Sequence, residues 1–156
     1  RGADVRCALV GDGVSRPGLA ALAAELGLGT DVCALPGRVD HRLALSWYQA
    51  LDVFCVPRLD TPVCRMVTPM KPLTAMALGR PVVASDLPAL AEVTESGRGR
   101  SFPPGDPEAL AEVMTAMAAG EPGSGASAEA ARGTAAPLPT WKENGRRNAE
   151  KYEELR

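Results

Sequence analysis

The feature that most constrains this chain is a regular alternation of short apolar runs with longer amphipathic segments. The apolar runs are rich in Val, Ala, Leu and Cys, and turn-forming residues follow most of them, which is typical of strands. They occupy residues 5–10, 32–35, 53–56 and 82–84, and residues 99–102 (Gly-Arg-Ser-Phe) are expected to form a last strand.

The segments between these runs place apolar residues three and four apart, which predicts helices. The helices are expected at residues 16–26, 41–50, 69–78, 87–93 and 107–118, with Asp40 and Asp106 as N-caps. Residues 57–68 are expected to form a long polar loop. Strands that are apolar on both faces and alternate with helices favour a parallel sheet covered on both faces. The predicted fold class is therefore α/β, Rossmann-like.

The chain of 156 residues is long enough for one ordinary domain. We expect that domain to span residues 1–119. Residues 120–139 consist mostly of Gly, Ala, Ser and Pro and are expected to form a flexible linker. Residues 140–156 are expected to form a charged helix with a docking stripe. The chain opens without Met and enters a strand-like run almost at once, so we expect it to be cut from a longer protein.

Composition excludes several classes of function. The 17 basic residues are balanced by 19 acidic ones, a net charge of −2, which disfavours nucleic acid as a partner. No apolar run approaches the roughly 18 residues needed to span a bilayer. Contact with a membrane is therefore not visible, and a cytoplasmic location is expected.

Cysteine and histidine do not suggest a metal site. The four cysteines include no Cys-x-x-Cys pair, and three of them lie in apolar runs, so we expect reduced thiols in or near the core. His41 is the only histidine, which leaves a zinc site or a histidine-centred triad without partners.

In an open parallel sheet, ligands bind beyond the carboxyl ends of the strands, so the loops at 11–15, 36–40, 57–68 and 85–87 are the informative ones. Gly11-Asp12-Gly13 resembles the opening of a dinucleotide-binding fingerprint, but Arg16 stands where a third glycine is needed. A tight strand-to-helix turn explains the two glycines equally well. No phosphate-binding loop of the Gly-x-x-x-x-Gly-Lys type is present, which argues against an ATPase or GTPase.

Three cations lie near the start of the helix expected at 69–78: Arg58, Arg65 and Lys71. The free N–H groups and the dipole of a helix start favour an anion, so a phosphate could dock there. The alternative is that these are ordinary solvated charges.

Four segments together resemble the carboxy-terminal, donor-binding half of a family 4 glycosyltransferase with the GT-B fold. They are GDG after the first apolar run, GRVDHRLALSWYQALDVFCVPR, KPLTAMALGRPVVASDLPAL and GDPEALAEVM. The resemblance runs from about residue 5 to residue 118, and Thr140-Trp141 with Tyr152 resembles the last helix of the family.

The resemblance implies a site for a nucleotide-diphosphate sugar, which is a substrate, with no further cofactor and no metal. It assigns Arg38 and Val39 to the base, and Thr74 to the ribose. It assigns the diphosphate to Arg65, Thr68 and Lys71. It also places Gly11, Gly13 and Arg58 along the cleft. No catalytic residue is assigned, since the acceptor site belongs to an amino-terminal domain that is not in this chain. The fragment is therefore expected to be inactive alone, although the family implies a sugar transfer that retains the anomeric configuration.

Two departures from the family pattern weaken the expected ribose contact. The family commonly carries a pair of glutamates at the positions of Met66 and Thr74. A subgroup of the family already lacks the first glutamate. The second glutamate holds the ribose hydroxyls. A threonine can reach only one hydroxyl, and it carries no charge. Weaker or altered nucleotide binding is the resulting hypothesis.

The main alternative is a non-catalytic GT-B remnant that binds nucleotide weakly or serves as an interaction domain. A GT-B phosphorylase would need a cofactor lysine that the sequence does not reveal, and an epimerase would usually need more histidine and carboxylate groups. A flavodoxin-like or NAD-binding module is disfavoured by the missing third glycine.

Overall fold

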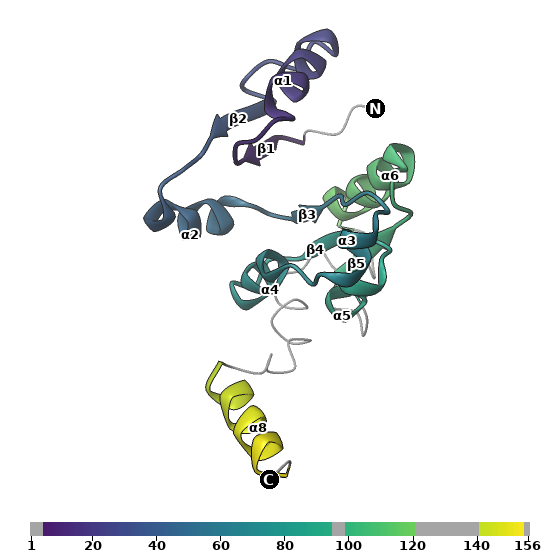
Figure 1. The fold of residues 1–156 in the computed structure, drawn as a ribbon. Helices are drawn as coiled ribbons and strands as arrows, with labels where there is room; N and C mark the ends of the chain where they lie inside the picture. Colours follow the sequence, from purple (N-terminus) through teal and green to yellow (C-terminus); the bar gives the residue numbers. More distant parts are fainter. Residues whose placement is uncertain (1–4, 95–98, 121–140, 155–156) are drawn as a thin grey trace. The chain divides into compact units, whose positions relative to one another are not determined.

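The computed structural model describes residues 5–94, 99–120 and 141–154 (Figure 1). The chain divides into two compact units, Arg1–Leu51 and Asp52–Arg156. Among the described residues no helix is long and apolar enough to cross a membrane.

The first unit is a βαβα segment built on two parallel strands. Its elements are β1 (Cys7–Val10), α1 (Arg16–Glu25), β2 (Cys33–Gly37) and α2 (His41–Ala50). Strands β1 and β2 pair in parallel, with Cys7 opposite Cys33 and an irregularity in register before Val10 meets Gly37. The predicted cap of α2 is confirmed, because the Asp40 carboxylate accepts the N–H of Arg42 at 2.7 Å.

The second unit holds a three-stranded parallel sheet with the order β3-β4-β5. Its elements are β3 (Phe54–Val56), α3 (Pro62–Met66), α4 (Met70–Ala77), β4 (Val82–Ser85), the 3-10 helix η1 (Pro88–Leu90), α5 (Ala91–Thr94), β5 (Gly99–Phe102), α6 (Pro107–Ala118) and α8 (Trp141–Glu154). Parallel strands alternating with helices confirm the predicted α/β, Rossmann-like class. In the described residues the strands belong to two sheets, of two and three strands.

The core of the second unit forms where α6 covers the sheet. Val83, Phe102 and Met117 are buried together, with apolar residues of α6 around them. Side chains alternate along a strand, so Val82 and Ala84 point to the opposite face from Val83. They are also fully buried, and α4 and α5 contact β4. Strand β4 therefore lies in a sheet that is covered on both faces, as its apolar sequence predicts.

The prediction of an uninterrupted loop at 57–68 is wrong, because α3 lies inside it. Thr61 caps this short helix by accepting the N–H of Cys64 at 3.3 Å, and Pro62 occupies its first turn. Both features favour a helix start. The short helix expected at 87–93 is present as η1 followed by α5.

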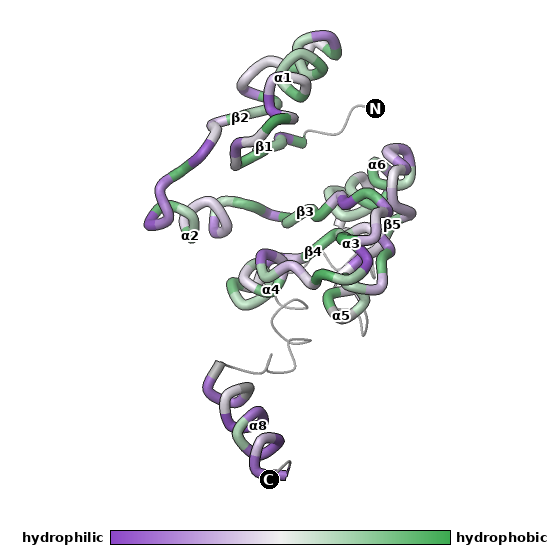
Figure 2. Tube along the Cα trace, in the orientation of Figure 1, coloured by the Kyte–Doolittle hydropathy of each residue, from purple (hydrophilic) through white to green (hydrophobic). Residues whose placement is uncertain are grey.

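Some expectations lie partly or wholly outside the described residues. Most of the predicted linker at 120–139 is among them. So is Leu155, which was expected to form the docking stripe of the last helix with Trp141, Ala149 and Tyr152. Helix α8 is hydrophilic along most of its length (Figure 2), and Tyr152 is exposed. Of the cysteines, Cys33 is buried and Cys55 and Cys64 are half-buried, whereas Cys7 is exposed rather than in the core.

Candidate functional site

The loops after β1 and β2 are joined by a backbone hydrogen bond. The N–H of Gly11 donates to the carbonyl oxygen of Gly37 at 3.0 Å. Gly37 has a φ of 79°, in the left-handed region that favours glycine, and it is buried. It turns the chain directly into Arg38 and Val39. The first is exposed and the second half-buried, so both follow the carboxyl end of β2 as the sequence predicts.

Gly13 lies in the turn that leads from β1 into α1. Its N–H donates to the Asp12 carboxylate at 2.9 Å, and its carbonyl accepts the N–H of Arg16 at 3.1 Å. Within the described part of this unit, nothing lies within 4 Å of where a Cβ on Gly11 or Gly13 would be. The glycine turn thus leaves space for a ligand. Its own hydrogen bonds also explain the two glycines as a tight turn.

In the second unit, Arg58 lies two residues beyond the carboxyl end of β3. Its Nη1 donates to the carbonyl oxygen of Val67 at 2.8 Å. Val67 ends α3 and immediately precedes the exposed Thr68. The guanidinium of Arg58 therefore lies beside the segment that leads into α4.

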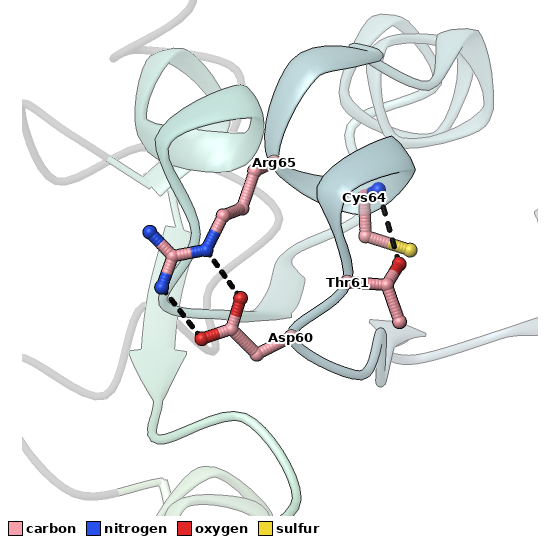
Figure 3. Close-up of polar contacts among 4 residues, drawn as sticks. All are labelled: Asp60, Thr61, Cys64 and Arg65. Atoms are coloured by element: carbon pink, nitrogen blue, oxygen red, sulfur yellow. Dashed lines mark hydrogen bonds and ion pairs between the residues drawn. The ribbon is translucent and has the colours of Figure 1, made fainter.

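Arg65 is already paired. Its Nε and Nη2 donate to the two carboxylate oxygens of Asp60, the second at 2.6 Å (Figure 3). The Arg65 hydrogen bonds lower the pKa of Asp60 below its usual value, and the carboxylate in turn raises the pKa of Arg65. A fork-shaped guanidinium satisfied by a carboxylate has less to offer a phosphate. No sequence motif singles out Asp60. The available signal is its place directly before a Thr-Pro pair, which favours a helix start.

The start of α4 leaves backbone donors without partners. Its N-cap is Pro69, which provides no capping side chain, and a further proline lies at residue 72. Prolines have no N–H, so only the N–H groups of Met70 and Lys71 remain of the four donors that a helix start normally presents. Lys71 is exposed, and its side chain makes no hydrogen bond or ion pair within the described parts of the chain. The start of α4 therefore offers a cation and two amides that no other described residue bonds.

Thr74 lies one turn further along α4, three residues after Lys71, so the two share a face of the helix. Its hydroxyl donates to the carbonyl oxygen of Met70 at 3.3 Å. The hydroxyl oxygen can still accept up to two hydrogen bonds. Met66, at the other position where the family carries a glutamate, is 75% exposed.

The structure thus brings Arg58, Thr68, Lys71 and Thr74 to the segment around the start of α4, in the second unit. Gly11, Gly13, Arg38 and Val39 lie on the loops of the first unit. No group of three or more histidine, cysteine or acidic side chains suited to a metal ion occurs among the residues that the structure covers.

Comparison with known proteins identifies relatives for most of the chain. The model of the family described as glycosyl transferases group 1 matches residues 1–120. A phosphatidyl-myo-inositol mannosyltransferase of Mycobacterium leprae is 37% identical over 82 residues, which are 52% of this chain and 21% of that protein. The chain thus spans about a fifth of the length of this curated relative.

Solved structures share the fold. Sucrose-phosphate synthase from Thermosynechococcus elongatus is 27% identical with a TM-score of 0.77, covering 95% of this chain and 38% of that one. The Anabaena protein Alr3699/HepE, solved in complex with UDP-glucose, is 22% identical with a TM-score of 0.75, covering 96% of this chain and 41% of that one. These proteins are more than twice as long as the chain, which matches about two-fifths of each.

Proposed function

The chain belongs to the group 1 glycosyltransferases, and from this premise we propose that it binds the nucleotide-diphosphate sugar from which the sugar is transferred. The substrate would be held by its diphosphate at the start of α4. The solved Anabaena relative, which is in complex with UDP-glucose, supports a nucleotide sugar as the ligand class.

The observation that carries this proposal is the free start of α4. The N–H groups of Met70 and Lys71 and the ammonium of Lys71 present positive charge without a protein partner among the described residues. A diphosphate leaving group gains negative charge as the bond to the sugar breaks, and donors fixed in advance stabilise that charge. Lys71 is therefore the centre of the proposed site.

Two other cations would have secondary roles. Nη1 of Arg58 donates to the carbonyl oxygen of Val67, so Arg58 could bind a phosphate only through its remaining N–H groups. Arg65 would first have to exchange Asp60 for the phosphate. We therefore rank Lys71 above Arg58, and Arg58 above Arg65, as contributors to diphosphate binding.

The remaining contacts are proposed from the family resemblance. Arg38 and Val39 would contact the base, Gly11 and Gly13 would line the cleft, and Thr74 would accept one ribose hydroxyl. Transfer with retention of configuration, to an acceptor bound by another domain, completes the proposal. The chain spans two-fifths of its solved relatives, which supports the view that the acceptor site belongs to a part outside this chain.

Titration calorimetry with UDP, GDP and their sugar conjugates tests the proposal. We expect at least one of these ligands to bind, and we expect Lys71→Ala to weaken the diphosphate by about tenfold while leaving the matching nucleoside unchanged. Lys142→Ala removes an exposed lysine from α8 and serves as the matched control. Equal losses of diphosphate and nucleoside would instead assign Lys71 a packing role.

A second candidate function is a non-catalytic remnant that binds nucleotide poorly. Thr74 favours it, because its hydroxyl already donates within α4 and it lacks the charge of the family glutamate. An absence of heat with every nucleotide at millimolar concentration would support this candidate over the first.

A further inference from the structure

Arg16, which interrupts the dinucleotide-like fingerprint, has a specific place in the structure. It is the first residue of α1, and its side chain reaches from that helix to the neighbouring strand. Its Nη2 donates to the carbonyl oxygen of Leu35 in β2 at 3.1 Å. A charged donor on a carbonyl makes a stronger hydrogen bond than a neutral pair.

The same guanidinium lies over the side of Gly37 where a side chain would be. A Cβ placed on Gly37 would be 3.6 Å from Nη2 and 3.7 Å from both Cζ and Nε of Arg16. Three nearly equal distances mean that the face of the planar group, rather than its edge, is turned to the glycine. A Cβ there would be in ordinary van der Waals contact, so the guanidinium faces Gly37 across the space that a side chain would fill.

Gly37 thus has neighbours on two sides. Its carbonyl accepts the N–H of Gly11, which directly follows β1, and the guanidinium of Arg16 faces it from α1. Its left-handed φ of 79° sets the direction in which the chain leaves β2. Arg38 and Val39 follow immediately, so their position depends on how firmly Gly37 is held.

We propose that Arg16 is a positioning residue that fixes the loop after β2 for binding of the nucleotide base. This inference rests on the proposed function, in which Arg38 and Val39 contact the base. Arg16 acts through Gly37 and Leu35 and does not touch the nucleotide. A loop already held in its bound conformation loses less entropy on binding, which raises affinity without a new contact.

A direct contact between Arg16 and a phosphate is the alternative. It is disfavoured because one Arg16 donor is used by Leu35 and because Asp12 places a carboxylate in the same turn. The two roles predict different losses when Arg16 is removed. A positioning role affects every ligand that carries the base, whereas a phosphate contact affects only phosphorylated ligands.

The test compares Arg16→Ala with Arg16→Lys by calorimetry, using the nucleoside diphosphate that binds best and its nucleoside. We expect Arg16→Ala to weaken both ligands by the same factor, about tenfold. Arg16→Lys should recover part of the loss, because lysine can donate to Leu35 but has no planar group to lay on Gly37. Arg42→Ala removes an exposed arginine just after the same loop and should change neither ligand.

A loss confined to the diphosphate, or no loss at all, would overturn the proposal. A second measurement separates it from the proposed function. Without ligand, hydrogen exchange at the amides of Arg38 and Val39 should be faster in Arg16→Ala than in the wild-type chain. Faster exchange in a chain that binds no nucleotide would refute the proposed function alone, and unchanged exchange would refute the role of Arg16.

Discussion

At the scale of single residues, the account depends on which cations are already satisfied within the chain. The sequence places three cations near one helix start, and the structure separates them by their partners. Asp60 holds Arg65, the carbonyl of Val67 holds Arg58, and Lys71 makes no such contact among the described residues. Both arginine pairings depend on α3, and the sequence alone did not predict this helix.

Removing the partner of Arg65 should therefore change ligand binding. We predict that Asp60→Asn strengthens nucleoside diphosphate binding by about threefold to tenfold, because it frees the guanidinium and removes a repelling charge. Asp52→Asn removes another exposed carboxylate of the same unit, one that makes no ion pair with a described residue, and it should have little effect. Calorimetry measures the affinity of both variants for the nucleoside diphosphate. An equal gain in both would mean that net charge alone causes the effect.

The same pair has a defined pH dependence. Arg65 lowers the pKa of Asp60 in the folded chain, so the contribution of the pair to stability is present above the unfolded pKa of about 3.9. That contribution is lost as pH falls through the lower, folded value. We predict that wild type and Asp60→Asn differ in thermal midpoint above pH 4 and converge in more acid solution. Both side chains are exposed, at 55% for Arg65 and 41% for Asp60, so the difference should be small and should shrink with added salt. A difference that grows below pH 4 would contradict this assignment.

Thr74 allows a test of the ribose assignment. Thr74→Glu restores a carboxylate that can accept both ribose hydroxyls, and we predict about tenfold tighter binding of the nucleoside diphosphate. The matching 2′-deoxynucleotide should gain less, because it offers one hydroxyl fewer. An identical gain for both ligands, or none, would show that Thr74 does not face the ribose.

At the scale of elements, the sequence predicted the strands and most helices because their signals are local. Asp40 and Asp106 cap α2 and α6 as expected. Helix α3 was missed because five residues are too few to show a helical period. Its Thr-Pro start is a sufficient signal for a helix, but the polar residues around it are typical of a loop. The same error hid Asp60.

The cap of α6 gives an element-level prediction of stability. The Asp106 carboxylate accepts the N–H groups of Glu108 and Ala109 at 3.0 and 2.9 Å. Asp106→Ala should lower the free energy of unfolding by about 1 kcal/mol, since both donors lose their acceptor. Urea denaturation measures this. Glu112→Ala on the same helix is the control, because the exposed Glu112 side chain makes no hydrogen bond with a described residue. Nucleotide binding should be unaffected by either variant.

At the scale of the whole molecule, the alternation of strands and helices was enough to predict the fold class, whereas the site was predicted only in part. The loops were found because parallel strands expose their carboxyl ends together. Which side chains are free was not predictable, because the partners of Arg58 and Arg65 lie outside the motif that singled them out. The predicted domain limits and the linker at 120–139 stay predictions.

The size of the chain relative to its relatives leads to a functional prediction. If the acceptor site lies outside this chain, the chain should bind a nucleotide sugar without turning it over. Proton NMR of the sugar anomeric signal, followed over a day, should show no more loss of the bound nucleotide sugar than in buffer. Transfer or hydrolysis by the chain alone would contradict the proposal that it is only the donor-binding part.

The central claim is that the diphosphate is bound by the start of α4. Its most direct measurement is a titration of the isotopically labelled chain with the best-binding nucleoside diphosphate, followed by amide NMR. The account predicts that the amide signals of Met70 and Lys71 shift most within the second unit, and that the matching nucleoside leaves them in place. Diphosphate binding that leaves both amides unshifted would contradict it.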